Sequence, residues 1–142
     1  MKRLVQFVRL TRPERRVLME AVALCTLAGV LLRILRFPRL APRLGQHMAE
    51  SPAQHDSATL AEVIRIRWAI AAAARYLPWK PVCLPQAVCA QWMLRRHQIP
   101  STLYLGIDPS RGYDAHAWVR VGKVIVTGGP GQERYAVVST FA

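Results

Sequence analysis

The chain has 142 residues, 52% of them hydrophobic, and its 20 Lys and Arg against 8 Asp and Glu give a net charge of +12. This length corresponds to one domain, and the hydrophobic content excludes general disorder. The charge favours acidic partners, but the arginines lack the interleaved aromatic residues of a nucleic-acid stacking surface, so we expect no nucleic-acid binding. The three cysteines form no CxxC pair, so we expect neither a structural metal nor a cofactor.

The first predicted helix begins after Thr11. Thr11 and Glu14 have the spacing of a capping box, and Pro13 fits the first turn, where a missing amide costs nothing. The apolar run over residues 17–35 extends this helix, but Glu20 and Arg33 interrupt the roughly 20 uncharged residues that a membrane span needs. Three interpretations stay open: a helix buried against a partner, a helix on a membrane surface, and a span.

Residues 45–57 are polar, which predicts a linker or mobile loop. We therefore place a helical arm and linker at residues 1–56 and a core domain at residues 57–142. The first residues show no apolar core followed by a cleavage site, so we expect no secretory signal. An odd number of cysteines then favours the cytoplasm, with the 17–35 helix as the candidate membrane contact.

A second helix is predicted from about Ala58 to Tyr76, with Ser57 as its cap. Five apolar residues fall on one face at helical spacing: Leu60, Val63, Ile64, Trp68 and Ala71. Ile66 and Ile70 widen this apolar stripe, so we expect much of the helix to be enclosed in the core.

A third helix runs from about Leu84 to His97, and because Pro85 fits only a first turn, its start lies next to Cys83. The partial positive charge and unpaired amides of a helix N-terminus favour a thiolate, and a nearby imidazole can remove the thiol proton. Cys83 is therefore a candidate nucleophile. The competing interpretation is a small buried hydrophobic residue, which we expect for Cys25.

After Pro100 the apolar pattern changes from helical to alternating. Strands are predicted at residues 102–107, 116–121, 124–127 and 135–139, with a tight hairpin turn at residues 122–123. Helices followed by an antiparallel meander predict an α+β fold. His116 begins the second of these strands, either as a core residue or as a general base for Cys83.

Several segments carry a resemblance to a known family. They are CLPQAVCAQWMLRR at 83–96, IPSTLYLGI at 99–107, AHAWV at 115–119, ERYAVVSTF at 133–141, and RPERR at 12–16 before an apolar helix. These segments resemble the transglutaminase-like branch of the papain-like cysteine enzymes, and within it the leader peptidases of lasso-peptide biosynthesis. The resemblance implies a papain-like/transglutaminase-like core, with the cysteine at a helix start and the histidine on a later strand.

The resemblance further implies a cysteine peptidase that removes the leader from a ribosomally synthesised lasso-peptide precursor. Cys83 would attack the scissile carbonyl, and His116 would act as the general base. A separate small leader-recognition protein and an ATP-dependent lasso cyclase are the implied partners. Two alternatives remain: capture of the acyl-enzyme by an amine, and a non-catalytic, membrane-associated scaffold of a peptide-maturation complex.

This sequence departs from the family pattern at the third catalytic residue. That residue is an aspartate on the strand after the histidine strand, and residues 124–129 hold no carboxylate here. Asp114 ranks first as a replacement, followed by Asp108. Otherwise Thr127 or a backbone carbonyl orients the imidazole, or the site is a dyad.

Overall fold

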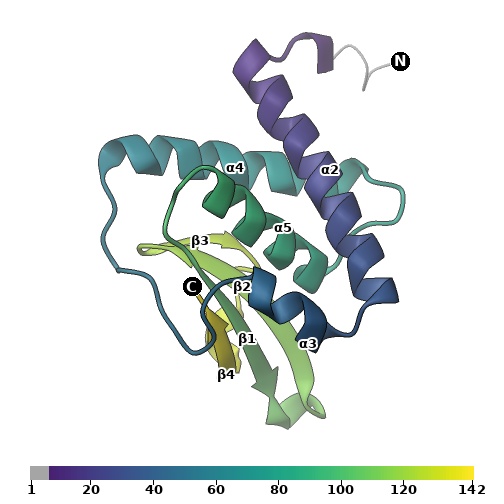
Figure 1. Cartoon of the computed structure of the whole chain (residues 1–142), viewed down its shortest axis with the longest axis vertical. Helices are drawn as coiled ribbons and strands as arrows, with labels where there is room; N and C mark the ends of the chain where they lie inside the picture. Colours follow the sequence, from purple (N-terminus) through teal and green to yellow (C-terminus); the bar gives the residue numbers. More distant parts are fainter. Residues whose placement is uncertain (1–6) are drawn as a thin grey trace.

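A helical layer covers one face of an antiparallel sheet in the computed structural model, which describes residues 7–142 (Figure 1). The first six residues of the predicted arm lie outside the described residues. The helices are α2 (Arg12–Ile34), the short α3 (Phe37–Leu40), α4 (Ser57–Tyr76) and α5 (Cys83–Arg96). The strands are β1 (Thr102–Asp108), β2 (Asp114–Val121), β3 (Val124–Thr127) and β4 (Ala136–Phe141). Helices followed by an antiparallel sheet confirm the predicted α+β class.

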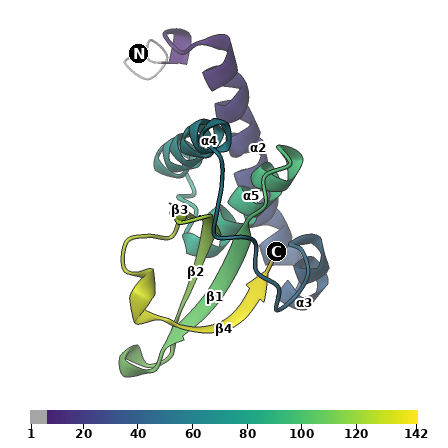
Figure 2. The same cartoon turned by 90° about the vertical axis from the view of Figure 1, so that its left-hand side faces the viewer.

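The sheet has the strand order β3-β2-β1-β4. The first three strands form the predicted meander, but β4 pairs with β1 and not with β3. The segment over residues 128–135 therefore carries the chain from one edge of the sheet to the other (Figure 2). That crossing segment lies beside the start of β2, where it contacts the candidate site described below.

The start of α2 follows the predicted capping box. The Thr11 side chain accepts the Glu14 amide, and the Glu14 carboxylate accepts the Thr11 amide at 2.7 Å. The inner face of α2 packs against α4 and α5 through small residues: Val17, Ala21, Cys25, Ala28 and Gly29. Since one core cluster includes residues on both sides of position 56, the arm shares the core, and the boundary at 56 stays a prediction.

The structure corrects two details of α4. Asp56 caps the helix by accepting the Thr59 amide at 2.7 Å, so Ser57 is the first helical residue and not the cap. Ile64 and Trp68 are exposed, whereas the buried face comprises Val63, Ile66, Ala69, Ile70 and Ala73. The apolar residues of α4 lie on most sides of the helix, so their periodicity alone does not determine which face is buried. Packing against α2 and α5 determines it.

Residues 45–56 form no helix or named strand, as predicted for a loop, but the start of this segment is anchored to the sheet and is not mobile. Gln46 and Ala142 exchange two backbone hydrogen bonds of 2.7 and 3.2 Å, and the Met48 amide donates to the Thr140 carbonyl at 2.7 Å. This segment therefore pairs with the outer edge of the end of β4.

Gln91 is a fully buried polar residue that joins three distant segments. Its Nε2 donates to the carbonyls of Leu44 and Phe141 at 2.8 and 3.1 Å, and its Oε1 accepts the Ser101 hydroxyl at 2.9 Å. We expect Gln91→Leu to lower the free energy of unfolding by about 3 kcal/mol, because the two carbonyls and the Ser101 hydroxyl lose their hydrogen-bond partner. Urea denaturation followed by circular dichroism measures this loss. The exposed Gln54→Leu should change stability by less than about 0.5 kcal/mol, and equal stability of both variants would contradict this role.

Candidate active site

Cys83 is the first residue of α5 and is half-buried. Its N-cap, Val82, has no side-chain acceptor, so the amides of Cys83 and Leu84 stay available to a ligand, whereas Pro85 has no amide proton and the Gln86 amide donates to the Val82 carbonyl. Cys83 shares a helical face with Ala87, Ala90 and Leu94, which are all fully buried. The thiol therefore packs against the core and stays accessible at the helix end where an anion is favoured.

The other two cysteines are fully buried. The Cys89 thiol donates to the Ala21 carbonyl at 3.6 Å, across the interface between α5 and α2. A hydrogen bond with Cys25, together with burial, raises the pKa of Cys89. Both cysteines therefore contribute to core packing, and Cys83 is the one cysteine whose thiol a substrate can reach.

His116 is the third residue of β2 and lies opposite Gly106 of β1. Its Nε2 lies 2.5 Å from the carbonyl oxygen of Gly128. A carbonyl only accepts hydrogen bonds, so Nε2 carries the proton, and Nδ1 of the neutral ring keeps the lone pair that a general base needs. The rings of Trp118 and Tyr135 pack against the imidazole, with centroids 5.9 and 4.8 Å away. The orienting group is thus a backbone carbonyl.

Gly128 allows this carbonyl to approach the imidazole. Its φ of 85° lies in the left-handed region, and an added Cβ would come within 2.5 Å of the Ala117 carbonyl and 2.6 Å of the Trp118 Cβ. The sequence shows two consecutive glycines here, but it does not show which side chain their backbone carbonyls contact. Thr127, the neighbouring candidate, has a buried hydroxyl with no hydrogen-bond partner in the described part of the chain, and so does not hold the imidazole.

Asp114 contacts Tyr135 and makes no hydrogen bond to His116. The Asp114 carboxylate accepts the Tyr135 hydroxyl at 2.9 Å, and this hydrogen bond raises the pKa of Tyr135. Asp108 caps the following turn by accepting the amide and hydroxyl of Ser110, which lowers the pKa of Asp108. Asp114 is therefore linked to the imidazole only indirectly: its carboxylate binds the Tyr135 hydroxyl, and the Tyr135 ring packs against the imidazole.

The fold packs the helix of Cys83 against the strand of His116. Strand alternation places His116 on the face opposite Ala117, which is buried in the helix-facing core. Because β3 ends at Thr127, which pairs with Val119, no paired strand covers the edge of β2 beside His116. No hydrogen bond joins the Cys83 thiol to the imidazole among residues 7–142. Cys83 lies in the helical layer and His116 points to the other face of the sheet, so the structure does not bring the two side chains together.

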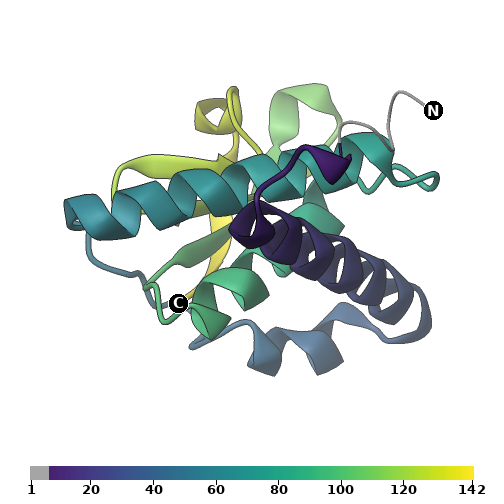
Figure 3. The same ribbon diagram turned by 90° about the horizontal axis from the view of Figure 1, so that it is seen from above.

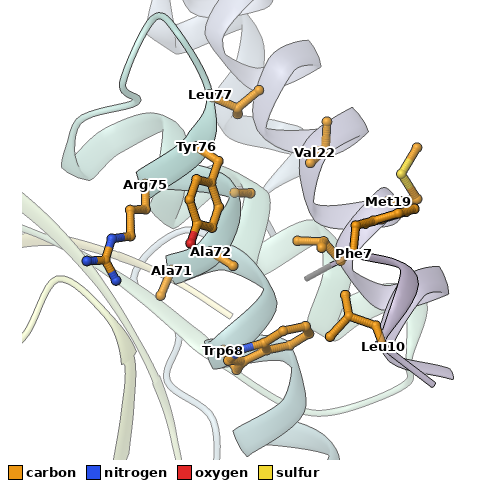
Figure 4. A pocket seen from close by; sticks show the side chains of 12 residues that line it. Phe7, Leu10, Met19, Val22, Trp68, Ala71, Ala72, Arg75, Tyr76 and Leu77 are labelled. Carbon is orange, nitrogen blue, oxygen red and sulfur yellow. The ribbon is translucent and has the colours of Figure 1, made fainter. Parts of the chain in front are cut away.

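A cavity of about 630 Å³ lies between α2 and α4, and neither candidate residue lines it (Figure 4). Its walls are apolar and aromatic, with Phe7, Met19, Trp68 and Tyr76 around it and Arg75 as its charged residue. It contains no nucleophile. The neighbours of Cys83 on both sides instead line a smaller hollow of about 300 Å³ at the end of α2. Within the described range, no cluster of His, Cys, Asp and Glu could hold a metal ion.

Residues 28–140 match the model of the transglutaminase-like superfamily. The chain belongs to the transglutaminase-like superfamily. The match runs from α2 to β4 and includes Cys83, His116 and Gly128. This superfamily includes cysteine proteases and transglutaminases, and the match indicates a fold of the cysteine-peptidase type. Comparisons with curated proteins and with solved structures found no match.

Proposed function

We propose that this transglutaminase-like protein is a cysteine peptidase that removes the leader from a ribosomally synthesised lasso-peptide precursor. The observation that carries the proposal is the superfamily match over both Cys83, at the uncapped start of α5, and His116, on the strand packed against that helix. The resemblance of its segments to the lasso-peptide leader peptidases supports the choice of substrate.

The reaction begins when Nδ1 of His116 takes the proton of the Cys83 thiol. The thiolate attacks the scissile carbonyl carbon, and the free amides at the start of α5 stabilise the resulting oxyanion. The imidazolium then gives its proton to the leaving amine of the core peptide. Water hydrolyses the thioester, which releases the leader as a carboxylate and regenerates the thiol. For the first step, the imidazole and thiol must come within hydrogen-bond distance when the peptide binds.

The partners in this proposal are a separate small leader-recognition protein and the ATP-dependent lasso cyclase, which takes the freed core peptide in the cytoplasm. The net charge of +12 supports binding of an acidic leader or partner, because it attracts carboxylates at long range.

A reconstituted cleavage assay tests the proposed function. The full chain is mixed with the precursor and the leader-recognition protein, and mass spectrometry follows the products. We expect two fragments whose masses sum to that of the precursor plus one water. Stable binding of the precursor without cleavage would favour the non-catalytic scaffold instead.

Asp114→Asn should leave kcat/KM of precursor cleavage within about threefold of wild type, because an asparagine oxygen can still accept the Tyr135 hydroxyl. Steady-state kinetics across a range of precursor concentrations measures this. A loss of more than about 100-fold, the scale of a missing acid–base contact, would instead place Asp114 on the imidazole in the working enzyme.

A further inference from the structure

The outer face of α2 carries an apolar stripe that no part of the described chain covers. The α2 stripe comprises Met19, Ala23, Leu27, Val30 and Ile34, all exposed and spaced three or four residues apart on one helical face. Its four large side chains expose 54%, 46%, 46% and 70% of their surface. The opposite face of α2 packs on α4 and α5, so the stripe lies at the surface. Seen from above, the α2 ribbon lies in front of α5 and the sheet (Figure 3).

Arginines flank the α2 stripe at both ends. Arg12 and Arg16 lie on the same helical face before Met19, and both are exposed. The other end is followed by the exposed Arg33, Arg36 and Arg39. The stripe therefore has positive charge at both ends.

The two carboxylates of α2 do not offset this charge. Glu14 accepts the amide and hydroxyl of Thr11 in the capping box at 2.7 Å. Glu20 points to the end of α5, where it binds Arg96 at 2.9 Å and His97 at 3.0 Å. Beside the aliphatic and cationic groups, this side of α2 exposes Thr26, whose hydroxyl donates to the Val22 carbonyl of its own helix at 2.8 Å.

We propose that the α2 stripe docks the protein on the surface of an anionic lipid bilayer. Aliphatic side chains between basic residues suit the boundary between headgroups and acyl chains, where arginines contact lipid phosphates. By length and composition alone, α2 could cross a membrane. However, a span would separate its buried inner face from α4 and α5, whereas surface docking leaves that packing intact.

A lipid surface fits the stripe better than a protein partner does. Protein interfaces concentrate aromatic anchors in well-packed pockets, and none of the five stripe residues is aromatic. Met19 at the start of the stripe also lines the aromatic cavity between α2 and α4, whereas the rest of the stripe, from Ala23 to Ile34, lies outside that cavity. The docking uses no group of the proposed peptidase site, so it stands independently of that function.

Vesicle flotation with the full chain tests the docking. We expect the protein to float with vesicles of phosphatidylcholine and phosphatidylglycerol at low salt, and to remain unbound with pure phosphatidylcholine. Raising the salt concentration should weaken the binding, because salt screens the arginine–lipid attraction. Absence of flotation with the anionic vesicles, or equal binding to both kinds, would overturn the proposal.

The apolar part of the stripe is tested by the double variant Leu27→Asn/Val30→Asn. We expect its partition coefficient on anionic vesicles to fall at least about tenfold, because both side chains lose their transfer into the acyl boundary. The matched control is Val137→Asn/Val138→Asn on β4, where the two valines expose 50% and 52% of their surface. The control should bind like wild type, and equal losses in the two double variants would count against the stripe.

The basic part is tested by Arg12→Gln/Arg16→Gln. Each arginine near an anionic surface contributes about 1 kcal/mol, so removing two should lower the partition coefficient about 25-fold. Arg67→Gln/Arg111→Gln removes the same charge from exposed positions outside α2 and should change it less than about threefold. Equal losses would show general charge attraction and would overturn the assignment to α2.

Two further readouts separate this proposal from its alternatives. Light scattering that shows a dimer, lost in Leu27→Asn/Val30→Asn, would assign the stripe to a second copy of the chain and overturn lipid docking. Without vesicles, both α2 double variants should cleave the precursor at the wild-type rate. A wild-type protein that floats but does not cleave would refute the proposed function and leave the docking intact.

Discussion

Cys83→Ala should abolish cleavage of the precursor, with a fall in kcat/KM of at least about 10³-fold, because no other accessible thiol can form the acyl-enzyme. The side chain is half-buried at the end of a helix, so its truncation should leave the fold unchanged. Mass spectrometry of the products measures the loss of activity, and circular dichroism with thermal unfolding checks the fold.

Cys89→Ala is the matched control for this variant. Cys89 is fully buried between α5 and α2, so its truncation should lower the free energy of unfolding by about 1 kcal/mol and leave kcat/KM unchanged. Cys83→Ala is thus expected to lower activity without changing stability, and Cys89→Ala to lower stability without changing activity. Cleavage that survives Cys83→Ala would refute the peptidase assignment.

His116→Gln should lower kcat of precursor cleavage by about 10²- to 10⁴-fold and leave KM nearly unchanged, because it removes the general base without removing a peptide-binding surface. Glutamine is close to histidine in size, and its amide can still donate to the Gly128 carbonyl, so the loop should keep its place. Single-turnover kinetics separates the chemical step from binding.

His47→Gln serves as the control for the histidine. His47 forms a hydrogen bond with the Ser139 hydroxyl at 2.6 Å, and its ring packs at a tilt against Phe141, so it is partnered as His116 is, but on a different edge of the sheet. Its variant should cleave at the wild-type rate. If both histidine variants kept full activity, the base would have to be another group and the dyad of Cys83 and His116 would be excluded.

Cys83→Ala and His116→Gln each remove one partner of the same contact, the hydrogen bond between thiol and imidazole that must form when the peptide binds. The free structure holds the imidazole on Gly128 and the thiol on the helical layer, with no hydrogen bond between them. We therefore expect the double variant to be no less active than the worse single variant, because residues that act as one unit lose their contribution together.

Local chemistry was enough to predict the starts of α2 and α5 and the hairpin turn before β3, but not the cap of α4 or the starts of β2 and β4. The capping box of Thr11 and Glu14, the first-turn position of Pro85 and the turn at residues 122–123 involve only neighbours in the chain. For the same reason the sequence placed Cys83 at a helix N-terminus. The change from helical to alternating periodicity was enough for the α+β class.

Tertiary structure decided everything that depends on distant partners. It selected the buried face of α4, which a nearly continuous apolar surface left open, and it paired β4 with β1 across the sheet. It also placed the Gly128 carbonyl on the imidazole, twelve residues away along the chain. Every residue has a backbone carbonyl, so the sequence has no signature for the one that binds His116. The path of the crossing segment after β3 determines that this carbonyl is the one of Gly128.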